Sequence, residues 1–403
     1  MIAAVLILLA AQAAQAVQTA QSAVPASGTT GREVVVTALP LAATARALAE
    51  CLARHCPPAE DIEATLAHAE NQFIAGDYPN ARRTLLAGRG RNKRFARDLP
   101  VAVADLSRAN ARLAGLNGQA ESALIGEIES LDALKAGLPG DDPRVLRQRI
   151  EIGDVQARQG GLTAAVGQYA SVAAQARRAG ATLVEAQAMF RTAMLYGVAA
   201  SVDPVYRSAA RGAVKRIVER PEPEFAPFHD GVIMLEARLQ QGKEQGAAIE
   251  RALATFRSRP GTRPVLIFSP PISLDQAERG YSGDGVRVVQ GTVKARGDDL
   301  AQWADVSFFI AADGTVHDVD VLRESPNRSG RWLDHVTRSI AGRRYSPLPT
   351  EAGGPGLLRV ERHSLVFDRI LDTGSRIVTR SSVGRIDTID LTADPAARDA
   401  PKG

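Results

Sequence analysis

Hydrophobic positions recur with the period of an α-helix from Leu41 to about Arg257. Many of them are alanine, and glycine or proline interrupts the pattern at intervals. Short breaks of this kind separate helices from one another. The pattern therefore predicts an all-helical region over residues 41–257.

A phrase of two helices around a glycine turn recurs in this region. The phrases span 66–86, 106–125, 150–174 and 232–256, and their turn glycines are Gly76, Gly115, Gly160 and Gly242, which lie 39, 45 and 82 positions apart. A stacked α-solenoid is built from units of two helices that are joined by a tight turn and have small residues where they cross. We expect a solenoid here, and an irregular helical bundle is the alternative.

The first phrase resembles a tetratricopeptide repeat. Ala69, Gly76, Tyr78 and Ala81 fall where that motif has small, turn, aromatic and small residues. The later phrases match more loosely and are spaced more widely than that repeat. The resemblance implies a TPR-like solenoid.

The chain changes to a strand pattern after the helical region. Residues 258–302 predict a linker with short strands. Val306, Phe308 and Ile310 then share one face of a strand, and Val319 and Val321 share one face of the next. Between the two strands, Asp313 and Gly314 are typical of a tight hairpin turn that needs a positive φ.

A helix and a third strand follow this hairpin. Residues 331–342 place Trp332, Val336 and Ile340 on one helical stripe. Residues 357–367 predict a strand, and 375–391 a further hairpin. The predicted fold is therefore α+β: an all-α solenoid followed by a small antiparallel sheet with one helix, over residues 303–392.

The two ends of the chain differ from both regions. Residues 1–16 combine an apolar run with Ala14-Gln15-Ala16, which is typical of a secretory signal peptide, although the basic start is missing. We expect export to the periplasm, with an uncleaved inner-membrane tether as the alternative. Residues 17–40 predict a flexible N-terminus, and residues 393–403 a disordered tail.

The amino-acid composition limits the classes of partner that the protein is expected to bind. The formal net charge of +4 is small for 403 residues, and the basic residues are scattered among acidic ones with only 4% aromatic residues. This composition disfavours nucleic-acid binding. The only cysteines, Cys51 and Cys56, can form a disulfide if the helix breaks near Pro57-Pro58, and two free thiols remain equally open.

The order hairpin, helix, aromatic-x-Pro and strand resembles the C-terminal domain of TonB-family energy transducers. The resemblance covers VSFFIAADGTVHDVDVL (306–322), Leu333, RRYSPL (343–348) and the strand ending at Phe367. It implies a periplasmic domain that pairs with an extended peptide of an outer-membrane receptor, by β-augmentation at an exposed sheet edge.

By analogy with the last strand of the family, we expect the pairing edge on residues 357–367. Its residues are Leu357, Leu358, Arg359, Val360, Glu361, Arg362, His363, Ser364, Leu365, Val366 and Phe367. The extra segment 375–391 could cover this edge. Residues 33–38 (EVVVTA) resemble the short receptor box itself, which would allow pairing within the chain or self-association.

The sequence carries no recognisable catalytic signature. There is no H-E-x-x-H, C-x2-C, G-x-S-x-G or P-loop motif, so we expect no enzyme, no cofactor and no metal site. The predicted function is a TonB-like protein–protein interaction module associated with outer-membrane receptors or transport machinery, including the inner-membrane motor. A scaffold with a purely structural β-domain and an enzyme with an interdomain site are the alternatives.

Overall fold

The structure is a computed structural model that describes residues 40–240, 243–257, 264–272, 274, 292–294, 301–347, 354–371 and 378–392. The predicted signal peptide, the box at 33–38, Gly242, most of the linker and the C-terminal tail lie outside these residues. Within them, a helical region is followed by a small antiparallel sheet with one helix. The predicted α+β class is confirmed.

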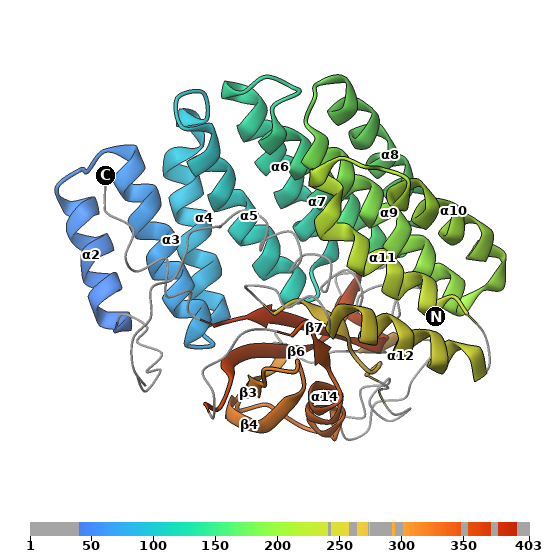
Figure 1. The fold of residues 1–403 in the computed structure, drawn as a ribbon. Coiled ribbons are helices and arrows are strands. Elements are labelled where there is room, and N and C mark those ends of the chain that lie inside the picture. The colour runs from blue at the N-terminus through green and yellow to red at the C-terminus, as the bar shows by residue number, and fades with distance from the viewer. Residues whose placement is uncertain are drawn as a thin grey trace.

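The helical region is an α-solenoid of antiparallel helices that pack side by side (Figure 1). Its helices are α2 (Leu41–Ala53), α3 (Pro58–Ile74), α4 (Tyr78–Asn92), α5 (Pro100–Leu116), α6 (Ala120–Gly137), α7 (Pro143–Arg158), α8 (Leu162–Arg178), α9 (Thr182–Val202), α10 (Arg207–Val218), α11 (Ala226–Arg238) and α12 (Lys243–Arg257). Short 3₁₀ turns, η2 (Lys93–Phe95), η3 (Pro204–Tyr206) and η4 (Pro223–Phe225), lie between some of them.

Three helical hairpins, α3–α4, α5–α6 and α7–α8, turn on glycines that are 42 residues apart. These are Gly76, Gly118 and Gly160, each with a positive φ. At each turn two backbone bonds close a Schellman motif; in the first, Asp77 N–H donates to Gln72 O and Gly76 N–H to Phe73 O. The prediction of Gly115 as the second turn residue is wrong, because Gly115 lies inside α5.

Small residues fill the crossings within each hairpin. Ala69 and Ala81 are buried where α3 meets α4, and Ala111 and Ala123 are buried where α5 meets α6. At the second crossing, a Cβ on Gly126 would lie 2.8 Å from the Cβ of Ala111. The helices therefore approach more closely than larger side chains would permit.

The β-domain is a five-stranded antiparallel sheet with the order β2-β7-β6-β3-β4. Its strands are β2 (Thr292–Lys294), β3 (Gln302–Ile310), β4 (Val316–Glu324), β6 (Leu357–Leu371) and β7 (Val378–Asp390). A separate pair joins β1 (Leu266–Phe268) to β5 (Arg344–Tyr345). Residues 378–390 form one strand that pairs with β6, so the predicted separate hairpin at 375–391 is wrong.

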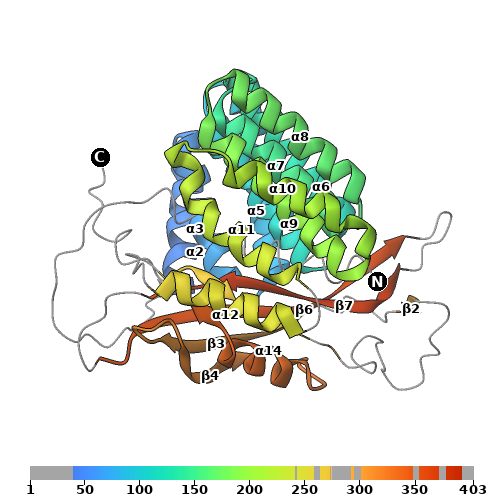
Figure 2. The same ribbon diagram turned by 45° about the vertical axis from the view of Figure 1, so that its right-hand side comes forward.

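One face of the sheet carries the helix α14 (Trp332–Ala341). The predicted stripe of Trp332, Val336 and Ile340 is confirmed, since all three are fully buried in the same apolar cluster as Phe308 and Ile310. The opposite face of the sheet lies against the solenoid, beneath the ends of its helices (Figure 2). The sheet is therefore a middle layer between α14 and the solenoid.

Candidate functional site

The strand predicted as the partner-binding edge is an inner strand of the sheet. β3 pairs with β6 from Leu357 to Leu365, and β7 pairs with the other side of β6 from Glu361 onward. Val360 also bonds beyond the end of β7, since its N–H donates to Thr392 Oγ1 and its carbonyl accepts from Leu391 N–H. The prediction of an open edge is therefore wrong from Val360 to Phe367, because β7 of the same chain occupies the place expected for a partner strand.

The first three residues of that predicted edge differ from the rest. Among the described residues, Leu357, Leu358 and Arg359 pair with β3 alone. Arg359 still contacts the neighbouring strand through an ion pair of 3.1 Å with Asp390. Three residues are at the short end of usual strand lengths, so they offer only a short ladder to an added strand.

The outer strand of the sheet is β4, which pairs with β3 on one side. Its register slips twice, once on each side of the Val306–Ser307 pairs. Asp318, at one slip, has a φ of 50°, which is a bulge conformation. At the other slip, Val321 and Leu322 are 44% and 52% exposed. β4 is thus the long strand that presents an outer edge and apolar side chains in the described sheet.

The predicted turn at Asp313 and Gly314 joins β3 to β4. Gly314 has a φ of 82°, and Asp313 Oδ1 accepts hydrogen bonds from Thr315 N–H (2.9 Å) and Thr315 Oγ1 (2.6 Å). A Cβ on Gly314 would lie 2.0 Å from the carbonyl oxygen of Tyr345. The glycine therefore permits a close approach of β5, which is a structural role.

A charged cluster is buried on the α14 face of the sheet. Glu361 accepts a hydrogen bond of 2.8 Å from Arg343, and its other neighbour is His363 Nε2 at 3.2 Å. Burial would raise the pKa of Glu361, but Arg343 and His363 lower it to about 2. Burial lowers the pKa of His363, whose Nδ1 lies 3.0 Å from Thr388 Oγ1. Glu361 is thus an ionised carboxylate held by a buried arginine.

The opposite face of β6 holds the contact with the solenoid through Arg362. Its guanidinium, with 0% exposure, donates to Asp305 Oδ1 (2.6 Å) and Oδ2 (3.0 Å). The same group donates to the carbonyl oxygens of Phe73 (2.5 Å) and Ile74 (2.8 Å) at the end of α3. Helix C-termini present free carbonyls and a negative dipole end, so Arg362 caps α3 from another domain.

Further groups surround this contact. Arg323 of β4 also donates to Asp305 (2.5 Å) and to Ile74 O (3.1 Å). The Trp303 ring lies 4.0 Å from the guanidinium carbon of Arg362 and packs into the solenoid core. A Cβ on Gly76 would lie 2.4 Å from this ring. Both charges of the Arg362–Asp305 pair are thus satisfied, so the interdomain carboxylate is a structural group.

The second solenoid hairpin is contacted in an equivalent way. Arg385 of β7 donates to Gly115 O (2.7 Å), which corresponds to Phe73 O one 42-residue unit earlier. Arg369 N–H donates to Gly118 O (2.6 Å), and Arg380 donates to Asn117 O (3.4 Å). The sheet therefore makes equivalent contacts on successive repeats, with arginine side chains at each helix end.

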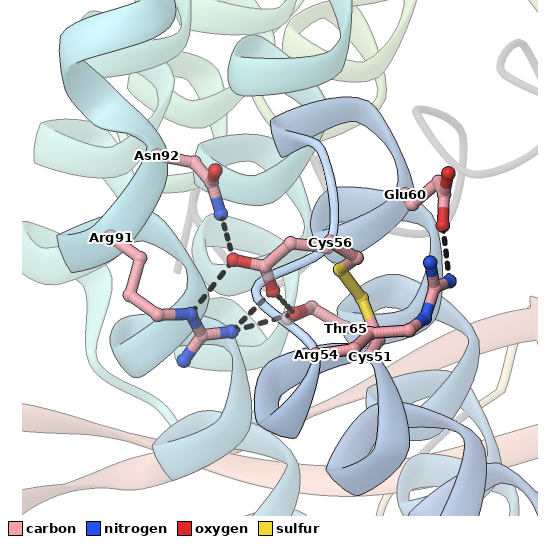
Figure 3. The surroundings of a disulfide bond; sticks show 8 residues. Cys51, Arg54, Cys56, Glu60, Thr65, Arg91 and Asn92 are labelled. Atoms are coloured by element: carbon pink, nitrogen blue, oxygen red, sulfur yellow. Dashed lines mark hydrogen bonds and ion pairs between the residues drawn. A yellow bond between two sulfur atoms is a disulfide. The ribbon is translucent and has the colours of Figure 1, made fainter.

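Cys51 and Cys56 form a disulfide at the end of α2. His55 takes a φ of 53°, and Cys56 N–H donates to Cys51 O (3.0 Å), so a Schellman turn brings the two cysteines to a Cα–Cα distance of 5.1 Å. Figure 3 shows the disulfide near Arg91 and Asn92, which bind Asp61. Of the two alternatives, the structure has the disulfide.

Two classes of feature are not found among the described residues. No helix in that part of the chain is long and apolar enough to cross a membrane. No group of three or more His, Cys, Asp or Glu side chains is arranged there to hold a metal ion.

The comparisons with known proteins do not assign a family. No family model matches the sequence, and no curated protein matches it at a significant level. The structural features above therefore carry the argument about function.

The sequence reasoning missed the interdomain arginines. Arg362 and Arg385 stand in strands where alternation alone predicts a solvated face. A signal was present, because Arg362 alternates with the apolar Val360 and Val366 on one face of a long strand. A cation among apolar neighbours indicates a buried partner of opposite charge or free carbonyls.

Proposed function

We propose that the chain is a protein–protein interaction module of the cell envelope, which pairs an extended segment of a partner protein with the outer edge of β4. The observation that carries the proposal is the position of β4 at the edge of the sheet, with Val321 and Leu322 exposed. Unpaired backbone groups supply affinity in β-augmentation, and exposed side chains supply specificity. The resemblance to TonB C-terminal domains supports a periplasmic setting and a receptor-associated or transport partner.

The solenoid holds the sheet in place in this proposal. Arg362 and Arg385 fix β6 and β7 to two helix ends, so β4 is presented at the far side of a supported sheet. The analogy with the TonB family places a partner strand beside β6, but β7 already pairs along that side. We therefore place the partner strand at the outer edge of β4. No catalytic step is included in the proposal.

A second candidate function is a scaffold in which the β-domain only closes the solenoid. The contacts on α3 and α5 favour it, since they are what a structural cap requires. The bulge at Asp318 favours it too, because bulges protect edge strands from pairing. The two candidates differ in whether β4 accepts a strand.

The test uses the full chain with residues 33–38 deleted and a labelled synthetic peptide EVVVTA, with a scrambled peptide as control. We expect saturable binding and amide chemical-shift changes confined to β4 and its neighbours. Replacing Val321 and Leu322 by Lys removes two apolar contacts and is expected to weaken binding at least about tenfold. The control replaces Val205 and Val218, which are 70% and 52% exposed on the solenoid. Absence of binding, or equal loss in both variants, would assign the structural cap instead.

A further inference from the structure

The segment from Tyr78 to Arg97, which contains α4 and η2, is the exception to the mixed charge of this protein. It holds seven basic residues and no acidic residue: Arg82, Arg83, Arg89, Arg91, Lys93, Arg94 and Arg97. The expectation that basic residues are scattered among acidic ones is therefore wrong for this segment. These residues follow one another along α4, η2 and the turn after η2.

The outward face of this segment forms a continuous row. Residues at positions 83, 86, 87 and 90 are exposed, and their spacing places them on one side of α4. Lys93, Arg94 and Arg97, which are also exposed, follow in η2 and in the turn after it. Leu86 is 40% exposed in the middle of the row. A Cβ added to Gly90 would meet no other atom within 4 Å. The row, which we call the cationic row, thus has charges at both ends and a smooth apolar centre.

Most charges of the segment lack a carboxylate partner. Arg89 pairs with Glu129 and Arg91 pairs with Asp61, both on the sides of the helix. Arg82 bonds the neutral Gln119, Arg83 bonds the neutral Asn80, and Arg94 lies 4.7 Å over the Phe95 ring. Within the described chain, Lys93 and Arg97 form no ion pair. Five cations are therefore uncompensated on or beside one face.

We propose that the cationic row binds the surface of an anionic phospholipid bilayer. The row is about 20 Å long, from the 1.5 Å helical rise per residue, and a bilayer surface can lie along it. Lipid phosphates complement cations that have no carboxylate partner, and Leu86 and the Arg94–Phe95 pair match the boundary between headgroups and acyl chains. Leu86, exposed between the charges, favours a bilayer, which supplies apolar acyl chains, over an acidic peptide.

The row and the proposed partner edge lie on different elements. The turn before α4 lies against the β-domain, since a Cβ on Gly76 would lie 2.4 Å from the Trp303 ring, whereas η2 follows the other end of the helix. Three charges of the row, Lys93, Arg94 and Arg97, therefore lie at the end of α4 that is remote from the sheet. This inference is independent of strand pairing at β4, so either can fail alone.

The test is flotation of the full chain with vesicles of phosphatidylglycerol and phosphatidylcholine, and with vesicles of phosphatidylcholine alone. We expect binding to the anionic vesicles only, and weaker binding as salt rises. The variant K93E/R94E/R97E is expected to bind at least about tenfold more weakly, since each surface cation contributes about fivefold in affinity. The control R178E/R211E/R216E changes the same charge at exposed positions of α8 and α10 and is expected to bind like the unmodified chain.

Three results would overturn the proposal. The first is absence of binding of the unmodified chain to anionic vesicles. The second is an equal loss in both triple variants, which would indicate net charge alone. The third is binding of an acidic peptide by the row without vesicle binding, which would assign it to a protein partner. If K93E/R94E/R97E is unfolded by circular dichroism, R83E at the other end of the row replaces it, with an expected loss of about fivefold.

Discussion

At the scale of single residues, Glu127 is a buried solenoid carboxyl group whose environment moves its pKa toward neutral pH. It lies on α6 with 3% exposure, and Gln148 of α7 donates to its Oε2 at 2.6 Å. Burial, with Glu151 nearby, raises its pKa from 4.5 to about 7. The folded state therefore favours the neutral carboxylic acid.

This raised pKa predicts a pH-dependent stability. The contribution of Glu127 is fully present below pH 4.5 and is lost as pH rises through about 7, because the fold must then bury a carboxylate. Between pH 5 and pH 8 the loss is about 2–3 kcal/mol, at 1.36 kcal/mol for each pKa unit. Glu127→Gln keeps the shape without the charge, so the variant should be more stable than the unmodified chain at pH 8 by about that amount.

The measurement is the urea-unfolding free energy at pH 5 and pH 8. Glu121→Gln, at an exposed position of the same helix, is the control and should follow the unmodified chain. An unchanged pH slope in Glu127→Gln would show that Glu127 does not carry the effect.

At the scale of elements, the glycine turns of the solenoid have two separable roles. Gly118 and Gly180 have φ values of 67° and 70°, and both end a helix through a Schellman motif. Only Gly118 lies against the sheet, where a Cβ would approach the carbonyl oxygen of Phe367 to 2.3 Å; a Cβ on Gly180 would meet nothing within 4 Å. Helix ending and domain docking can therefore be measured apart.

Gly180→Ala should cost about 1–2 kcal/mol, which is the penalty of a left-handed backbone for a residue with a Cβ. Gly118→Ala adds a clash with β6 and displaces the Arg369 contact, so its loss should be larger by at least about 1 kcal/mol. Urea unfolding of both variants gives the comparison. Equal losses of unfolding free energy would mean that the sheet can shift at Phe367 without losing stability.

At the scale of the whole molecule, the solenoid and the sheet are joined by arginine side chains that bind carbonyl oxygens at the ends of helices. Arg362 satisfies Asp305 and two α3 carbonyls, and Arg385 repeats the contact on α5. Because the docking carbonyls recur every 42 residues, a sheet with correctly spaced arginines fits successive repeats. The solenoid and the sheet are therefore expected to be stable as one unit.

Arg362→Ala should destabilise the chain by about 3–5 kcal/mol, since it leaves a buried carboxylate without its fully buried partner. Arg323→Ala is the comparison, because Arg323 binds the same Asp305 but its side chain is 48% exposed, and it should cost less than about 1 kcal/mol. Urea unfolding measures both, and hydrogen exchange in α3 and β6 reports the docking. Similar losses of unfolding free energy in the two variants would contradict the expectation that the buried Arg362 holds the two regions together.

The sequence alone determined the local features of this protein. Period 3.6 gave the helical region, period 2 with Asp313-Gly314 gave the β3–β4 hairpin, and the stripe of Trp332, Val336 and Ile340 gave α14. These patterns arise from backbone geometry and the burial of one face, which nearby residues specify. The position of the second turn was missed because Gly118, rather than Gly115, takes the positive φ.

Only the tertiary structure decided which strand is an edge and how the two regions meet. β6 and β7 carry the same alternation as any half-buried strand, so their sequence does not say that β7 pairs with β6. The order of the strands depends on how much surface is buried between segments that lie far apart in the chain. The hydrogen bond from Arg362 to the carbonyl oxygen of Phe73 is one such distant contact. For that physical reason the predicted edge lies inside the sheet from Val360 to Phe367, and the long outer strand of the described sheet is β4.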